Sequence, residues 1–400
     1  YNSFIYLISA LVSLFSKFSS SNKLKLFVNG RKNWDQKLNL EKNHHRYWFH
    51  CASLGEFEQA KPIIESLKKV HPEYSIVVSF FSPSGYEQRK NYAFSDCVFY
   101  LPYDTKSNAK KLINLIQPKH LILVKYELWY NLISEFQKNE IPVSIISAVF
   151  NSNHFVFKWY GIPYLNRLKK VNKIFVQNSE SMDLLKNKGL TQIENAGDSR
   201  YDRVLEIATM SKNNETIQSF TNNQPCIILG SSWNPEINLI KNYLQLNPEC
   251  RYKIIIAPHD ISDNNILSLF KSFENYSVQL YTDFKPNNDS KILILNTIGH
   301  LASAYKYANI SIIGGGFSNA LHNILEPLAH GVPVLFGPNT NKYPEADFAL
   351  KNGVAFQVNE NSNLNDVFKQ LNSSDYKIKC KEFIIKNTGA TNKIVAYLLN

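Results

Sequence analysis

The stretch Gly314-Gly315-Gly316-Phe317-Ser318-Asn319-Ala320-Leu321-His322-Asn323-Ile324-Leu325-Glu326-Pro327 decides the fold of the carboxyl-terminal half of the chain. The apolar run 310–313 before it predicts a buried strand. The three consecutive glycines predict a sharp turn in which the backbone lies close to its surroundings. Ser318 or Asn319 is expected to cap a helix over about 321–330, and residues 332–336 predict the next strand.

A strand, a glycine turn and a helix N-terminus together favour an anion, because free backbone N–H groups and the helix dipole both attract phosphate. Glu326, about one turn into the expected helix, could accept hydrogen bonds from ribose hydroxyls. The spacing is neither the G-x-G-x-x-G of dinucleotide-binding proteins nor a Walker loop. Glycine turns without a ligand also occur in many α/β proteins, so a nucleotide site and a purely structural turn both stay open.

Composition indicates a globular protein whose positive charge is concentrated near its beginning. The 400 residues carry a formal net charge of +11. Residues 1–50 hold eight Lys or Arg and two acidic residues, which favours an anionic membrane surface or substrate over a nucleic acid. The five cysteines have no paired spacing, which predicts a reducing compartment with neither a disulfide framework nor a zinc site.

Residues 1–20 are expected to associate with a membrane. The run from Tyr1 to Phe18 is mostly apolar, with Lys17 as its one charged side chain, and it is shorter than the ~20 residues of a comfortable membrane span. The positive charges follow this run, which favours a short anchor on the cytoplasmic side over a signal peptide. The alternative is a helix buried against the first domain.

Apolar strand-like runs alternate with helix-like segments in both halves of the chain, which predicts two doubly wound parallel sheets. We expect a Rossmann-like domain over 21–210, a polar linker over 211–224 and a second Rossmann-like domain over 225–385. Residues 386–400 would end a helix, beginning near 375, that crosses back to the first domain. Such halves place a ligand cleft between them, at the carboxyl ends of their strands.

Two carboxylates follow strand ends in the first half. Glu56 lies at a helix start beside Gly55, where the helix dipole would keep it ionised and able to deprotonate a hydroxyl. Ser53 and Glu56 also have the spacing of a capping box, in which Glu56 would only bond back to a backbone amide. Glu127 could orient a sugar or support the base, with Lys125 as a possible ion-pair partner, or simply be an acidic residue at a helix start.

Polar groups follow strand ends in the second half as well. Ser231 and Ser232 could contact a phosphate or a sugar acid, and Pro258 stops a strand so that His259 could meet a base or a phosphate. A histidine in such a place is also often structural. No cluster of Asp, His or Cys has metal-ligand spacing.

Five segments resemble the 3-deoxy-D-manno-oct-2-ulosonic acid (Kdo) transferases of lipopolysaccharide synthesis, and the resemblance extends over nearly the whole chain. They are the apolar N-terminus leading to Gly30-Arg31-Lys32, His50 to Glu56 (H-x-x-S-x-G-E), Glu127-Leu128-Trp129 with Asn131 (E-L-W-P-N in the family), Gly197 to Asp202 (G-D-x-K-[FY]-D) and Gly314 to Pro338 (G-G-S-F…H-N-x-L-E-P…G-x-P-V-x-F-G-P). The departures are Tyr130 for Pro, Arg200 for Lys, Gly316 for Ser, Lys125 for an acidic residue, and His259-Asp260 where the family often has Arg-His.

The resemblance implies the α/β GT-B fold, with two Rossmann-like doubly wound domains facing each other across a cleft and a short apolar N-terminal membrane-anchor helix. It implies an inverting, metal-independent transferase that needs no cofactor and moves Kdo from CMP-Kdo to a hydroxyl of the lipid A precursor, lipid IVA. Such an enzyme is expected at the cytoplasmic face of the cell inner membrane, with no nucleic-acid partner.

The resemblance also assigns roles. Glu56 matches the family's general base, and Glu127 is expected to support it on the acceptor side. The expected donor-binding residues are Ser231, Ser232, Pro258, His259, Gly314, Gly315, Gly316, Asn323 and Glu326, and the expected acceptor-binding residues are Arg31, Lys32, Ser53 and Gly55. The alternatives are another GT-B nucleotide-sugar enzyme, such as a UDP-sugar transferase or epimerase, and a non-catalytic nucleotide- or lipid-binding protein.

Overall fold

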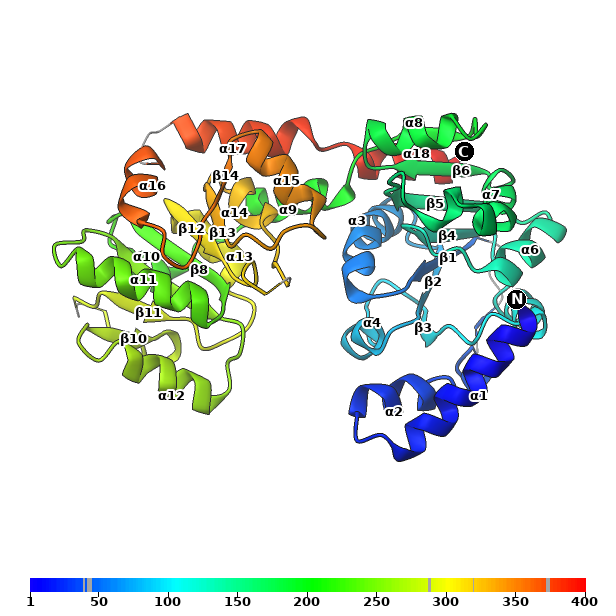
Figure 1. Ribbon diagram of the computed structural model, residues 1–400, viewed down its shortest axis with the longest axis horizontal. Coiled ribbons are helices and arrows are strands. Elements are labelled where there is room, and N and C mark those ends of the chain that lie inside the picture. The colour runs from blue at the N-terminus through cyan, green and yellow to red at the C-terminus, as the bar shows by residue number, and fades with distance from the viewer. Residues whose placement is uncertain (39, 42–44, 287–288, 319, 372–374) are drawn as a thin grey trace. The chain divides into compact units, whose positions relative to one another are not determined.

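The computed structural model describes residues 1–400 apart from 39, 42–44, 287–288, 319 and 372–374. The chain divides into two compact units, 1–202 with 388–400 and 203–387. Each unit is built on a parallel sheet with helices along its faces (Figure 1). The prediction of two doubly wound halves is therefore confirmed, and each half is described by itself.

Unit 1 holds a seven-stranded parallel sheet in the order β3-β2-β1-β4-β5-β6-β7 among the described residues. Its strands are β1 (Arg46–Cys51), β2 (Ser75–Phe80), β3 (Cys97–Tyr100), β4 (His120–Val124), β5 (Val143–Ala148), β6 (Lys173–Val176) and β7 (Ile193–Asn195). Its helices are α1 (Asn2–Phe18), α2 (Asn22–Asn29), α3 (Leu54–Val70), α4 (Pro83–Arg89), α5 (Lys106–Ile116), α6 (Tyr130–Lys138), α7 (Ile162–Leu168), α8 (Ser179–Lys186) and α18 (Ala390–Leu399), with α9 (Ser199–Met210) running across the unit boundary.

The central strand β1 is buried on both faces, as a parallel sheet covered by helices requires. Side chains alternate along a strand, so Trp48 joins the core on one face while Tyr47 and Phe49 join the core on the other. The strand order changes direction at β1, which pairs with β2 on one side and β4 on the other. The loops that leave the carboxyl ends of β1 and β4 are therefore neighbours.

The N-terminal helix α1 exposes most of its apolar side chains, although Ile5, Ile8 and Val12 are half-buried. Phe4, Leu7 and Phe15 are 60%, 59% and 64% exposed, and Ser16 is the buried residue of the helix. The alternative of a helix buried against the first domain is therefore wrong. None of the described helices is both long enough and apolar enough to cross a membrane.

Unit 2 holds a second seven-stranded parallel sheet, in the order β10-β11-β9-β8-β12-β13-β14 among the described residues. Its strands are β8 (Cys226–Ser232), β9 (Lys253–Pro258), β10 (Val278–Leu280), β11 (Ile292–Ile294), β12 (Ile310–Ile313), β13 (Val334–Phe336) and β14 (Ala355–Gln357). Its helices are α10 (Glu215–Thr221), α11 (Asn234–Leu246), α12 (Asp263–Ser272), α13 (Leu301–Ala304), α14 (Leu325–Ala329), α15 (Pro344–Lys351), α16 (Leu364–Leu371) and α17 (Asp375–Lys386).

Three helix expectations need correction. The expected linker contains α10, whose Ile217 and Phe220 are buried, so these apolar side chains make it part of unit 2. The expected helix over 321–330 is the five-residue α14, because residues 320–324 are irregular and the Ala320 and His322 amides donate instead to the carbonyls of Gly315 and Gly314. The expected helix from about 375 to 399 is two helices, since Gly389 adopts a left-handed φ of 109° between α17 and α18.

Candidate active site

The carboxylates Glu56 and Glu127 lie at the carboxyl end of the unit 1 sheet. Glu56 is in the first turn of α3, directly after β1, and Glu127 is in the turn between β4 and α6. Lys125 opens that turn with a left-handed φ of 63°, which bends the chain away from β4. Because β1 and β4 are paired neighbours, their loops bring the two acidic residues into one region, as the sequence predicted.

Glu56 is almost buried, with 7% of its surface exposed. Its carboxylate accepts a hydrogen bond from the Ala52 amide, whereas the Ser53 side chain makes no capping bond. Burial raises the pKa of Glu56, and the nearby positive charge of Lys125 and the backbone amides oppose that rise. Loss of water therefore outweighs the local favourable charges in setting the direction of the pKa shift of Glu56.

Glu127 is the more strongly perturbed carboxyl. Burial, and then the negative charge of Glu56, raise the pKa of Glu127 to about 8, while Lys125 acts in the opposite direction. The protonation of Glu127 therefore depends on the charge of Glu56, so the two carboxyl groups titrate as a pair. The pair therefore holds a proton at neutral pH, which gives the region both a potential acid and a potential base.

His50 was not singled out from the sequence, although it begins the segment that ends at Glu56. It is fully buried on β1, and its Nε2 lies 3.9 Å from Glu127 Oε2. Burial lowers the pKa of His50 to about 3, so its ring is neutral and the two groups do not form an ion pair. The sequence gives no signal for this contact, because it arises only when β1 pairs with β4.

The four expected acceptor-binding residues have different surroundings. Arg31 is buried, stacks 3.7 Å above the Phe27 ring and donates to the carbonyls of Phe27 and Phe81, so its contacts hold α2 against the unit. Lys32 is exposed. A Cβ added to Gly55 would have no described atom within 4 Å, which leaves open space beside Glu56.

In unit 2, the glycine turn uses several of its own polar groups. The Gly315 N–H donates to buried Glu236 at 3.0 Å, and the Gly314 N–H donates to the Gly230 carbonyl at 2.9 Å. Gly315 has a φ of +86°, and a Cβ there would lie 2.1 Å from the Ala320 carbonyl oxygen. These two amides are therefore occupied, which corrects the expectation that the whole turn offers free donors to phosphate.

Asn323, rather than Ser318, accepts a hydrogen bond at the start of α14. Its Oδ1 accepts from the Leu325 N–H at 3.1 Å, and its Nδ2 donates to Glu326 Oε1 at 3.0 Å. The Ser318 hydroxyl instead bonds the Gly315 carbonyl, and Asn319 lies outside the described residues. Asn323 and Glu326, both expected to bind the donor, therefore lie together.

The donor residues expected at the ends of β8 and β9 lie beside a cluster of aromatic rings, formed by Trp233, His259 and His322, that the sequence did not predict. The His259 ring stacks on Trp233 at 4.2 Å and lies 4.8 Å from His322, whose Nε2 is buried without a partner among the described residues. The Ser232 hydroxyl donates to the Ala257 carbonyl, and Ser231 takes a left-handed φ of 49°. Ser232 and Pro258 also line a cavity of about 270 Å³.

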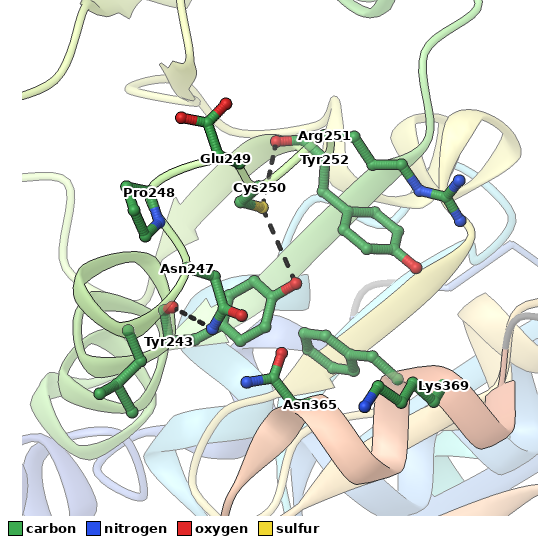
Figure 2. Close-up of a pocket in the computed structure, with 11 residues that line it drawn as sticks. Tyr243, Asn247, Pro248, Glu249, Cys250, Arg251, Tyr252, Asn365 and Lys369 are labelled. Atoms are coloured by element: carbon green, nitrogen blue, oxygen red, sulfur yellow. Dashed lines mark hydrogen bonds between the residues drawn. The ribbon is translucent and has the colours of Figure 1, made fainter.

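A larger cavity, of about 420 Å³, lies elsewhere in unit 2 (Figure 2). Its lining includes Tyr243, Cys250 and Tyr252, which precede β9, together with Phe368 and Lys369 of α16. It is therefore at the amino end of β9, whereas the expected donor residue Pro258 is at the carboxyl end. None of the site residues expected from the sequence lines it.

A metal site was not expected. In the part of the chain that the structure describes, no three His, Cys, Asp or Glu side chains are grouped as a metal ion would require.

Comparisons with known proteins bear on both the family and the fold. The family model described as "3-Deoxy-D-manno-octulosonic-acid transferase (kdotransferase)" matches residues 32–203. The chain is 28% identical over 340 residues to the 3-deoxy-D-manno-octulosonic acid transferase of Aquifex aeolicus, an alignment that covers 84% of this chain and 88% of that protein. It is also 28% identical over 308 residues to the Haemophilus influenzae protein of the same name, covering 74% and 72%.

A solved UDP-GlcNAc 2-epimerase from Neisseria meningitidis superimposes with a TM-score of 0.61 at 13% identity, covering 88% of this chain and 99% of that one. This likeness concerns the fold alone, and with the two parallel sheets it establishes the GT-B fold. The matched family model and these relatives confirm the predicted resemblance of the chain to the Kdo transferases, a family of glycosyltransferases.

Proposed function

We propose that this protein transfers Kdo from CMP-Kdo to a hydroxyl of the lipid A precursor, lipid IVA, with inversion at the anomeric carbon and Glu56 as general base. The observation that carries the proposal is the position of Glu56, which is nearly buried at a sheet's carboxyl end beside the open space at Gly55. A carboxylate whose pKa is raised by burial is a stronger base than one in water. The names of the relatives support the choice of transferred sugar.

The reaction balances as a single displacement. The acceptor oxygen forms a bond to the anomeric carbon while the bond from that carbon to the CMP phosphate oxygen breaks. CMP leaves with the bonding electron pair, and the hydroxyl proton goes to Glu56. Glu127, protonated at neutral pH, would donate a hydrogen bond on the acceptor side and limit the charge that builds up around Glu56.

Donor binding is assigned to unit 2. Asn323 and Glu326 offer adjacent amide and carboxylate groups to a ribose or a sugar acid, and His259 offers a ring beside Trp233. The amides of Gly314 and Gly315 are used within the turn, so we assign the CMP phosphate to Gly316 and the neighbouring side chains. No metal or cofactor takes part in this scheme.

Membrane association is part of the proposal. The exposed apolar side chains of α1 precede the basic residues of 17–46, a combination that suits a helix lying in an anionic bilayer surface. We therefore place the enzyme at the cytoplasmic face of the inner membrane. There it would meet a phosphorylated lipid acceptor.

The test is transfer from CMP-Kdo, generated in situ, to lipid IVA, followed by mass spectrometry of the lipid with and without a chelator. We expect additions of one or more Kdo units that persist in chelator and are lost in Glu56→Gln. Transfer from a UDP-sugar instead would favour a different nucleotide-sugar enzyme. CMP binding without any transfer would favour a non-catalytic role.

A further inference from the structure

His50 belongs to a chain of buried polar groups that crosses the unit 1 sheet. Its Nδ1 lies 2.8 Å from the Ser79 hydroxyl, and the Trp48 indole N–H donates to the same hydroxyl at 2.8 Å. His50 and Ser79 are direct neighbours in the register of β1 and β2, so the sheet itself sets this contact. All three side chains are fully buried.

The direction of the hydrogen bonds follows from what each group can do. The indole N–H is a donor only, so the Ser79 oxygen accepts from Trp48 and its own O–H is left to donate. His50 Nδ1 lies at hydrogen-bond distance from this hydroxyl, and it can accept the O–H only when it is itself unprotonated. A neutral imidazole that accepts at Nδ1 carries its proton on Nε2.

The Nε2–H is then a buried donor that faces a carboxyl group. Nε2 has no hydrogen-bond partner among the described residues, and Glu127 Oε2 lies 3.9 Å away, about 1 Å beyond an ordinary hydrogen bond. Glu127 lies in a turn and keeps 18% of its side chain exposed, whereas His50 is held rigidly by the sheet. A small rotation of Glu127 would therefore close the gap.

We propose that His50, held as the Nε2–H tautomer by Ser79 and Trp48, is a positioning residue that orients the Glu127 carboxyl through an Nε2–H···O hydrogen bond during transfer. One oxygen of Glu127 accepts from His50, which leaves the other oxygen for the acceptor substrate. This inference rests on the proposed function. Its first test, however, needs no substrate.

The first test is ¹⁵N NMR of the full-length protein labelled at histidine, which reports the tautomer of each imidazole. We expect His50 as the Nε2–H tautomer, a shift of its Nε2 signal in Glu127→Ala, and loss of the single tautomer in Ser79→Ala. An Nδ1–H tautomer in the wild-type protein would overturn the proposal. Because no turnover is needed, this result separates the inference from the proposed function.

The second test uses two substitutions of similar size. His50→Gln places an amide N–H₂ near the position of Nε2, and His50→Asn places one near Nδ1, so only His50→Gln keeps a donor toward Glu127. We expect kcat to fall roughly 10–100-fold in His50→Asn with KM little changed, and to stay within about threefold in His50→Gln. Equal losses in both variants would show a merely structural histidine.

The matched control is His120, which lies at the amino end of β4, whereas Glu127 follows the carboxyl end of that strand. His120 is also buried, and its Nε2 bonds the Ser144 hydroxyl at 2.9 Å within the same sheet. His120→Asn is expected to lower stability without changing kcat per folded molecule. If both His50 variants fail to fold while His120→Asn folds, the wild-type tautomer and the effect of Glu127→Ala on its Nε2 signal decide the question.

Discussion

The two sheets end in polar turns of opposite character. At the carboxyl end of the unit 1 sheet, Glu56 is buried and Glu127 is half-buried, and the loss of water raises the pKa of each despite the nearby charge of Lys125. At the carboxyl end of β12 in unit 2, polar groups of the turn are already hydrogen-bonded within the unit. Buried Glu236 accepts from the Gly315 N–H and from the Trp233 N–H. The first turn holds perturbed titratable groups, and the second holds a fixed backbone shape.

From this difference we expect the unit 1 turn to take part in proton transfer and the unit 2 turn to provide a rigid binding surface. Perturbed carboxyl groups in a partly open region are typical of acid–base chemistry. A turn whose groups are already hydrogen-bonded needs little reorganisation when a ligand binds, so its contribution is precise shape. Substitutions in the first turn should therefore change the rate, and substitutions in the second should change stability and donor affinity.

The largest expected effect is that of Glu56→Gln. It keeps the shape of the side chain but removes the base, so we expect kcat for Kdo transfer to fall by about 10²–10⁴-fold with CMP affinity unchanged. The assay is mass spectrometry of lipid IVA products, with CMP binding by calorimetry.

Glu58→Gln is the matched control for that experiment. Glu58 lies on the same helix and forms a 2.9 Å ion pair with Arg89 in partly exposed surroundings. Its transfer rate should equal that of the wild type. A Glu56→Gln protein with the wild-type rate would remove the basis for calling the unit 1 turn catalytic.

The next effect is the dependence of stability on pH. The native state keeps the Glu127 proton up to about pH 8, whereas an ordinary glutamate releases it near 4.5. Between these values the native state binds more protons, so the free energy of unfolding falls as pH rises, by up to about 1.4 kcal/mol per pH unit.

Urea unfolding of the wild type and of Glu127→Gln from pH 4 to pH 9 measures how much Glu127 contributes to the pH dependence of the free energy of unfolding. We expect the wild type to lose more stability than the variant between pH 5 and pH 8, and the two curves to become parallel as the pH approaches 9. Parallel curves throughout would mean that Glu127 has an ordinary pKa and that the contrast between the turns is false.

A smaller effect is expected from Gly315→Ala in unit 2. The left-handed φ of Gly315 and the nearby Ala320 carbonyl both oppose a Cβ, so we expect a loss of about 1–3 kcal/mol in the free energy of unfolding. Gly299→Ala is the control, because Gly299 has a similar φ of +97° but no described atom within 4 Å of an added Cβ. Equal losses in calorimetric unfolding would show that backbone strain alone, and not the packed turn, matters.

The smallest expected effect is that of Arg89→Gln on stability. The Arg89–Glu58 pair has side chains 32% and 37% exposed, so water screens it and the loss should be no more than about 1 kcal/mol. Thermal unfolding at low and at 0.5 M salt checks this. A loss above about 2 kcal/mol, independent of salt, would show that a surface pair on α3 matters as much as the buried carboxyls.

The sequence predicted the inner strands of both sheets, because fully buried parallel strands are near-continuous apolar runs such as 120–124 and 310–313. It missed β7, β10 and β14, which are three-residue strands at sheet edges and too short and too exposed to show such a pattern. It also overextended the helix after the glycines, because the apolar residues within 321–330 do not show where the hydrogen bonding of the preceding turn stops.

For the candidate site, too, the sequence predicted some features and missed others. The residues Glu56, Glu127, Asn323 and Glu326 could be named from the sequence, because each follows a strand end within a recognisable segment. The sequence could not show that Glu56 raises the pKa of Glu127, that His50 faces Glu127, or that Glu236 occupies the Gly315 amide.

Local pattern by itself thus determined the succession of inner strands along the chain, the polar residues at their ends and the resemblance to a family. Only the tertiary structure decided which of those polar groups are buried together and which hydrogen bonds remain to be made. The physical reason is that apolar periodicity is a property of neighbours in sequence. Desolvation, and the charge of one carboxyl acting on another, depend instead on strands such as β1 and β4 that are far apart along the chain and adjacent in the sheet.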